Sequence, residues 1–135
     1  KKWLLPTVEL IEVEEMAQDS SCLIVDVRSK ERFDGIFEPI DLIAGHIPNA
    51  MNIPFTENLD ENGLFLKPHE LKNIYKKKFG DKESDKIVVH CGSGVTACHT
   101  LLALAYASIE LPNLYVGSWS EWSRTKKIER TSNSL

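Results

Sequence analysis

Cys91 lies between a short apolar run and two closely spaced glycines, in the stretch HCGSGVTACH. A cysteine thiolate is a strong nucleophile, but it must be stabilised near neutral pH. Gly92 and Gly94 allow the chain to curl so that successive backbone N–H groups face one anion. A helix expected to follow adds its positive N-terminal end, and Ser93 and Thr96 add hydroxyl donors. The pattern favours a nucleophilic cysteine; the alternative is an inert core thiol beside a turn.

The residues after this cysteine disfavour a phosphatase. Cysteine phosphatases place an arginine after the cysteine and five further residues, where its guanidinium binds the phosphoryl group in a bidentate way. Counted from Cys91, that position is Ala97. The loop also contains no lysine or arginine, so we expect backbone N–H groups and hydroxyls to stabilise the thiolate.

Alternating strands and helices must position this loop. Short apolar runs typical of buried strands lie at 22–27, 50–55, 86–90 and 114–117. Helical patterns lie at 8–18, 29–33, 68–80, 96–109 and 119–124. Strands that alternate with helices predict an α/β domain with a mostly parallel sheet. Ligands bind outside the carboxyl ends of such strands, and Cys91 directly follows one of them.

Capping residues mark the ends of several expected helices. Thr7 is expected to cap the first helix, and Ser118 with Glu121 has the spacing of a capping box. Pro68 suits the first position of its helix, and Gly80 suits the end of the same helix.

Length and composition restrict the class of protein. The chain has 135 residues, enough for one domain with a core, and a formal net charge of -4, which argues against a nucleic-acid binder. No apolar stretch is long enough to span a membrane, and the first residues do not resemble a signal peptide. The three cysteines form no CxxC pair, so we expect no structural zinc site and a reducing, cytoplasmic compartment.

Four sequence motifs resemble one family. The loop CGSGVTA (91–97) resembles the active-site loop of the rhodanese-type sulfurtransferases, and specifically of their 3-mercaptopyruvate branch. LIVDVRSKERF (23–33), GHIPNAMNIPF (45–55) and YVGSWSEWSR (115–124) resemble further signatures of that family, in the same order along the chain. The chain is therefore identified as a member of this family, and we expect its fold to be rhodanese-like.

The resemblance implies a five-stranded, mostly parallel sheet flanked by helices, and a reaction in two steps. Cys91 would take sulfur from a donor and become a persulfide, and an acceptor such as a thiol, cyanide or thioredoxin would remove the outer sulfur. Ser93 would assist as a hydroxyl close to the sulfur. The loop residues expected to contact the donor are Gly92, Gly94, Val95 and Thr96. Neither a metal nor a cofactor is expected.

The donor is inferred from charge. Thiosulfate-preferring members carry basic residues just after the cysteine, whereas Gly92 and Ser93 are neutral, as in the 3-mercaptopyruvate branch. Arg32 matches a position that holds the donor's carboxylate, for which a guanidinium is well suited; the alternative is a surface charge on a helix. The segment 34–44 lacks a second arginine found in some members, which weakens this assignment and leaves thiosulfate as the alternative donor.

The resemblance also concerns the whole protein. Sulfurtransferases of this branch usually have two rhodanese-like domains, with the active cysteine in the second. We expect residues 1–135 to be a single domain that corresponds to this second half. A different class remains open, namely a non-catalytic rhodanese-like module that binds a partner.

The other polar and aromatic residues are expected to be structural. Asp26 and Arg28 are expected to form a bridge that organises loops, and His46 belongs to a structural turn. Because side chains alternate along a strand, His90 should point to the face opposite Cys91, which argues against a simple His–Cys couple. Trp119 is expected to pack the C-terminal helix; the alternative is that it lines the pocket.

Overall fold

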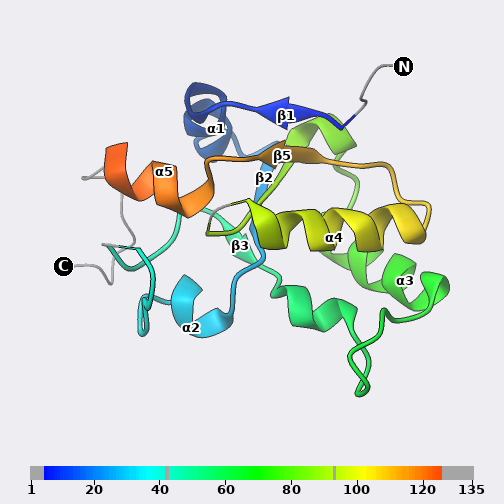
Figure 1. Cartoon of the computed structure of the whole chain (residues 1–135). Coiled ribbons are helices and arrows are strands. Elements are labelled where there is room, and N and C mark those ends of the chain that lie inside the picture. The colour runs from blue at the N-terminus through cyan, green and yellow to red at the C-terminus, as the bar shows by residue number, and fades with distance from the viewer. Residues whose placement is uncertain (1–4, 42, 93, 126–135) are drawn as a thin grey trace.

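The fold is seen in a computed structural model, which describes residues 5–41, 43–92 and 94–125. One parallel sheet in the order β1-β5-β4-β2-β3 runs through the middle of the molecule (Figure 1). Its strands are β1 (Thr7–Val8), β2 (Leu23–Asp26), β3 (Met51–Asn52), β4 (Ile87–His90) and β5 (Asn113–Tyr115). The predicted α/β architecture and the five-stranded parallel sheet are confirmed.

Helices cover both faces of this sheet (Figure 1). They are α1 (Leu10–Ala17), α2 (Lys30–Phe33), α3 (Pro68–Phe79), α4 (Val95–Tyr106) and α5 (Ser118–Thr125), with short 3-10 turns η1 (Phe55–Asn58) and η2 (Ser84–Lys86). Among the described residues, none of these helices combines the length and apolar character that a membrane span requires.

Two apolar cores explain the continuous apolar runs of β2 and β4. Val25 and Val89 pack on one face, with the inner sides of α3 and α4. Ile24 and Val88 pack on the other face, with α1 and α5, where Trp119 is buried and packs its helix, as predicted. A strand buried on both faces cannot show polar alternation, so continuous apolar runs were the correct signal for β2 and β4.

The first helix begins later than the sequence predicted. Thr7 and Val8 pair in parallel with Leu114 and Tyr115, so Thr7 belongs to an edge strand and does not cap a helix. The helix begins at Leu10, and its capping box is formed by Glu9 and Glu12. A strand of two residues is too short to show a periodic pattern, and this is why the prediction of a cap was wrong.

The predicted capping box of α5 is also wrong. Ser118 is the first residue of the helix, with a φ of 55°, and its hydroxyl bonds to the backbone of Cys91 and Tyr115. The Glu121 carboxylate accepts a hydrogen bond of 2.7 Å from the Tyr115 hydroxyl. Both side chains are therefore used for tertiary contacts that local spacing cannot reveal.

Candidate active site

The Cys91 sulfur lies at the N-terminus of α4. It accepts hydrogen bonds from the backbone N–H groups of Gly94 (3.1 Å) and Ala97 (3.2 Å), and the residue is only 1% exposed. The N–H groups at a helix start carry partial positive charge, so they favour a thiolate and an anionic adduct. The sequence prediction that the loop directs backbone N–H groups to this sulfur is confirmed for these two groups. Ala97, which stands where a phosphatase has arginine, contributes its backbone.

Gly94 makes the curl of the loop possible. Its φ is 95°, a conformation that side chains disfavour, and a Cβ at this position would lie 2.7 Å from the carbonyl oxygen of Val116. That contact involves backbone, which cannot move aside cheaply. The loop therefore needs glycine at this position for two independent reasons.

The start of α5 holds the same loop in place, which the sequence did not indicate. The Ser118 hydroxyl accepts from the backbone N–H of Cys91 (3.1 Å) and donates to the carbonyl of Tyr115 (2.9 Å). The backbone N–H groups of Trp119 and Ser120 donate to the carbonyls of Cys91 (3.0 Å) and Gly92 (2.9 Å). The loop that carries Cys91 is thus held by contacts from α4 on one side and from α5 on the other.

Arg32 reaches this loop from α2. Its Nη2 atom lies 3.2 Å from the place a Gly92 Cβ would occupy, so the guanidinium rests against the residue next to Cys91. The same Nη2 donates to Glu38 (3.0 Å) and Asp41 (3.3 Å). The side chain is 16% exposed, so Arg32 is not an ordinary surface charge. Neither carboxylate was identified from the sequence.

The remaining predicted site residues lie around this centre. Val95 and Thr96 form the first turn of α4, and the Val95 side chain is 75% exposed. Ser93 lies outside the described residues. The structure therefore brings Cys91, Gly92, Gly94 and Arg32 together.

Asp26 and Arg28 form the structural bridge that was predicted. Arg28 Nε and Nη2 donate to the Asp26 carboxylate at 3.0 and 2.7 Å, and both side chains are almost completely buried. The guanidinium also donates to the carbonyl of Gly45 (2.6 Å) and lies 5.2 Å from the centre of the Trp119 ring. These contacts connect β2 to the turn around His46, whose ring stacks on Phe33 at 3.7 Å.

His90 contacts the backbone of Cys91. Its Nδ1 lies 3.1 Å from the Cys91 carbonyl oxygen, so Nδ1 carries the proton in this contact, and Nε2 is 3.8 Å from Asp26. Burial lowers the pKa of the His90 imidazole below 6.5, against the opposing effect of Asp26. The ring lies on the face opposite the Cys91 side chain, next to Tyr115, as the alternation of the strand predicts.

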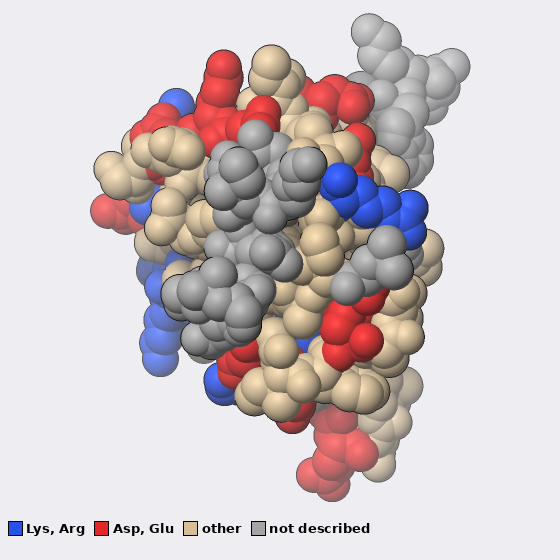
Figure 2. Space-filling model, turned by 90° about the vertical axis from the view of Figure 1, so that its left-hand side faces the viewer, with Lys and Arg blue, Asp and Glu red and all other residues tan. Residues whose placement is uncertain are grey.

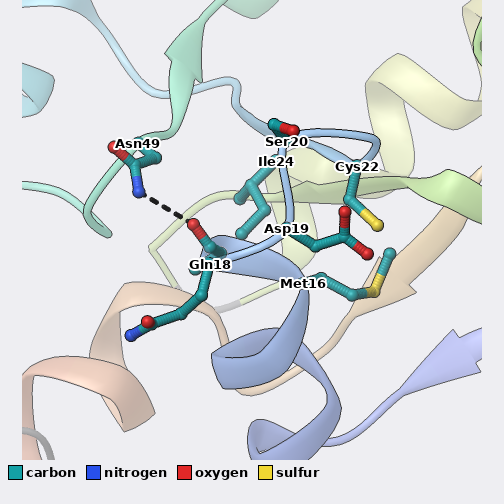
Figure 3. A pocket seen from close by; sticks show the side chains of 8 residues that line it. Met16, Gln18, Asp19, Ser20, Cys22, Ile24 and Asn49 are labelled. Atoms are coloured by element: carbon teal, nitrogen blue, oxygen red, sulfur yellow. Dashed lines mark hydrogen bonds between the residues drawn. The ribbon is translucent and has the colours of Figure 1, made fainter.

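The other features of the surface lie apart from this centre. A cavity of about 370 Å³ lies at the opposite, amino end of β2, where Cys22 and Met16 line it (Figure 3). Asn49 closes one side by donating to the carbonyl of Ala17 (2.8 Å). On the face shown in Figure 2, the Lys and Arg side chains of the described residues lie among acidic and uncharged ones.

The chain resembles known proteins along most of its length. Residues 9–125 match the model of the rhodanese-like domain. It is 50% identical over 99 residues to a probable 3-mercaptopyruvate sulfurtransferase of Pseudomonas aeruginosa, covering 73% of this chain and 35% of that protein. It is 39% identical over 124 residues to the thiosulfate sulfurtransferase of Rattus norvegicus, covering 90% of this chain and 41% of that protein.

A solved structure supports the same assignment. The 3-mercaptopyruvate sulfurtransferase from Leishmania major superposes with a TM-score of 0.71 at 30% identity, covering 90% of this chain and 33% of that one. The chain spans between a third and two fifths of the length of these relatives. With the parallel sheet, the buried cysteine at the start of α4 and the family match over residues 9–125, the chain belongs to the rhodanese-like domain family.

Proposed function

We propose that this domain is a sulfurtransferase that carries sulfane sulfur on Cys91, with 3-mercaptopyruvate as the favoured donor. The observation that carries the proposal is the pair of backbone N–H groups, from Gly94 and Ala97, that converge on the Cys91 sulfur at 3.1 and 3.2 Å. These N–H groups stabilise the thiolate on the Cys91 sulfur, and the partial positive charge at the start of α4 also favours a persulfide anion, whose charge lies on the outer sulfur.

In the first step the Cys91 thiolate attacks the sulfur of 3-mercaptopyruvate. A sulfur–sulfur bond forms, the carbon–sulfur bond of the donor breaks, and its electron pair passes to carbon as an enolate. The thiol proton of the donor ends on that carbon, which yields pyruvate and the Cys91 persulfide anion. Gly94 and Ala97 keep their hydrogen bonds to the inner sulfur throughout.

Arg32 is proposed to orient the donor. A guanidinium that rests against Gly92, next to the nucleophile, is well placed to bind a carboxylate in a bidentate way. The loop residues Gly92, Val95 and Thr96 would contact the rest of the donor, and Ser93 would donate a hydroxyl hydrogen bond.

In the second step an acceptor thiolate attacks the outer sulfur of the persulfide. The bond between the two sulfurs breaks, the acceptor leaves as a persulfide, and Cys91 returns as a thiolate. Small thiols, cyanide and thioredoxin are the proposed acceptors. A thiolate nucleophile must stay reduced between turnovers, so we place the reaction in the cytoplasm.

A second rhodanese-like domain is the proposed partner of this one. The chain spans 35% of its Pseudomonas aeruginosa relative, so further groups of a longer protein could contribute to donor binding. The proposal for this domain is limited to the persulfide step on Cys91.

Mass spectrometry of the chain after exposure to each donor tests the proposal. We expect 3-mercaptopyruvate to add one sulfur atom to the peptide that contains Cys91, and Cys91→Ser to abolish this gain. Thiosulfate is the second candidate because of the rat relative, and a gain with thiosulfate alone would reverse the donor assignment. If neither donor adds sulfur, the domain is a binding module and the proposal is wrong.

A further inference from the structure

Two carboxylates hold the arginine beside the active-site loop. Glu38 and Asp41 lie in the irregular segment that follows α2, and their side chains are 6% and 2% exposed. Both accept a hydrogen bond from the same Arg32 nitrogen. A ligand near Arg32 therefore feels one positive charge and two buried negative charges. Its electrostatic energy depends on all three.

The cluster around Arg32 has an excess of negative charge. Arg28 connects to it through Asp26 at 2.7 Å and Glu38 at 3.5 Å. Among the described side chains, this hydrogen-bonded group contains two guanidiniums and three carboxylates, so it carries one negative charge in excess. His90, which faces Asp26, does not compensate at neutral pH, because burial lowers its pKa.

Asp41 contacts two residues that touch the Cys91 loop, one through each carboxylate oxygen. Its Oδ2 lies 3.3 Å from Arg32 Nη2, which is the atom closest to the missing Cβ of Gly92. Its Oδ1 accepts from the Ser120 hydroxyl at 2.7 Å, and the Ser120 backbone donates to the Gly92 carbonyl at 2.9 Å. A donor anion bound by Arg32 therefore lies within a few ångströms of the Asp41 charge.

We propose that Asp41 is a specificity-determining residue, whose negative charge beside Arg32 favours a donor with one negative charge over a donor with two. The inference rests on the proposed function, in which Cys91 takes sulfur from an anionic donor. Coulomb energy is proportional to the charge of the ligand, so one carboxylate repels a dianion twice as strongly as a monoanion. Asp41 therefore disfavours the dianion thiosulfate more than the monoanion 3-mercaptopyruvate. This repulsion adds to the attraction that Arg32 exerts on either donor.

Asp41→Asn tests this charge effect with almost no change of shape. The amide oxygen can still accept from Arg32, and the amide nitrogen can donate to Ser120, whose hydroxyl can reverse its direction. At a separation of about 7 Å in water-like dielectric, we expect kcat/KM to rise about threefold for 3-mercaptopyruvate and about tenfold for thiosulfate. The ratio between the donors would fall about threefold. An unchanged ratio, or an equal change with both donors, overturns the proposal.

Two control variants test whether the effect depends on the charge of Asp41. One removes a hydrogen bond to Asp41, and the other changes the net charge of the chain far from the site. Ser120→Ala removes the hydrogen bond to Asp41 but keeps its charge, so the donor ratio should stay at the wild-type value. Glu83→Gln makes the same change of net charge at an exposed position beyond the amino end of β4, so it should not move the ratio either. A shift in either control as large as that of Asp41→Asn contradicts the proposal. Asp41→Ser, a second neutral side chain, should reproduce the shift.

Alkylation of Cys91 tests the same charge without any sulfur transfer. Iodoacetate carries one negative charge and iodoacetamide none, and peptide mass spectrometry separates Cys91 from Cys22 and Cys98. We expect Asp41→Asn to raise the iodoacetate rate at Cys91 about threefold relative to the iodoacetamide rate. An unchanged rate ratio overturns the role of Asp41, even if the chain transfers no sulfur. Conversely, a shifted ratio in a chain that gains no sulfur contradicts the proposed function and not the charge effect.

Discussion

Gly94 and Gly63 share a left-handed backbone but differ in their surroundings. Their φ values are 95° and 80°, yet a Cβ on Gly94 would lie 2.7 Å from a backbone oxygen, whereas a Cβ on Gly63 would meet nothing within 4 Å. We expect Gly63→Ala to lower the free energy of unfolding by about 1 kcal/mol through backbone strain alone. Gly94→Ala should cost about 2 kcal/mol more, because the overlap forces the loop to move.

The loop displacement should also be visible in the chemistry. Moving the Gly94 N–H away from Cys91 removes one of the two groups that stabilise the sulfur anion, so we expect Gly94→Ala to slow persulfide formation at least about tenfold. Urea unfolding and timed mass spectrometry measure the two effects, with Gly63→Ala as the matched control. Equal losses in the two variants would show that the contact with Val116 is unimportant.

Arg32 and Lys30 provide a second matched pair, on the same short helix. Arg32 lies against the loop, whereas the Lys30 side chain is 73% exposed and pairs with Asp34. Arg32→Lys keeps the charge but loses the planar fork, so we expect kcat/KM with 3-mercaptopyruvate to fall about tenfold, mostly through KM. Lys30→Gln should leave both constants unchanged. A full rate in Arg32→Lys would indicate that any cation suffices.

At the scale of elements, α5 supports the loop as much as α4 does. The Ser118 hydroxyl bridges the Cys91 N–H and the Tyr115 carbonyl, and the residue is fully buried. Ser118→Ala removes the buried hydroxyl that bonds both groups, so we expect a loss of about 1–3 kcal/mol of stability. Thr125→Ala on the same helix removes only an exposed hydroxyl contact to Glu121 and should cost less than about 0.5 kcal/mol. Thermal unfolding of both variants measures the two losses of stability. Similar losses would contradict this role of Ser118.

The elements that the sequence predicted are those with a strong local pattern. The continuous apolar runs at β2 and β4 and the Pro68–Gly80 boundaries of α3 follow from short-range physics, and the structure confirms them. The two residues of β1 could not be predicted, because a strand this short owes its existence to its pairing with β5. The same reason applies to Ser118, whose hydroxyl bonds replace the local capping box.

The site was predictable where its parts are contiguous in sequence. The loop from Cys91 to Gly94 was identified because glycine spacing and the following helix are local signals. Glu38 and Asp41 were missed because their importance depends on contacts with Arg32 and Ser120, up to 79 positions apart. Acidic residues in an irregular segment carry no periodic signal, so only the fold could reveal them.

At the scale of the whole molecule, the candidate active site and the buried groups behind it share the carboxyl end of the sheet. The loops that follow β2 and β4 meet the start of α5 at the carboxyl end of the sheet. Cys91 and Arg32 come together there. Buried polar and charged side chains stand directly behind this end of the sheet, with Asp26, Arg28 and His90 on the α5 side. Stability and reactivity are therefore coupled, since the same buried groups hold the loops and set the local charge.

The stability of the molecule should depend on pH through two of its histidines. Burial lowers the pKa values of His90 and His46 below 6.5 in the folded chain. In the unfolded chain both titrate near their ordinary value, so below about pH 6.5 the unfolded state binds more protons than the folded state. The contribution of each histidine to stability is complete above this pH and is lost as the pH falls. Each can lower the free energy of unfolding by at most about 1.4 kcal/mol per pH unit.

Urea unfolding at pH 7.5 and at pH 5.5 measures this loss, and His90→Gln should reduce it. A glutamine side chain has no proton to gain, so the difference between the two pH values should shrink by the share that His90 contributes, although the variant is less stable at both. His69→Gln, at an exposed position on α3, is the matched control and should keep the wild-type difference. An equal difference in the wild type and in His90→Gln would mean that folding leaves the pKa of His90 unchanged, with the contact to Asp26 offsetting burial. A larger difference in His90→Gln would mean that the contact with Asp26 outweighs burial and that His90 offsets the charge excess around Arg32.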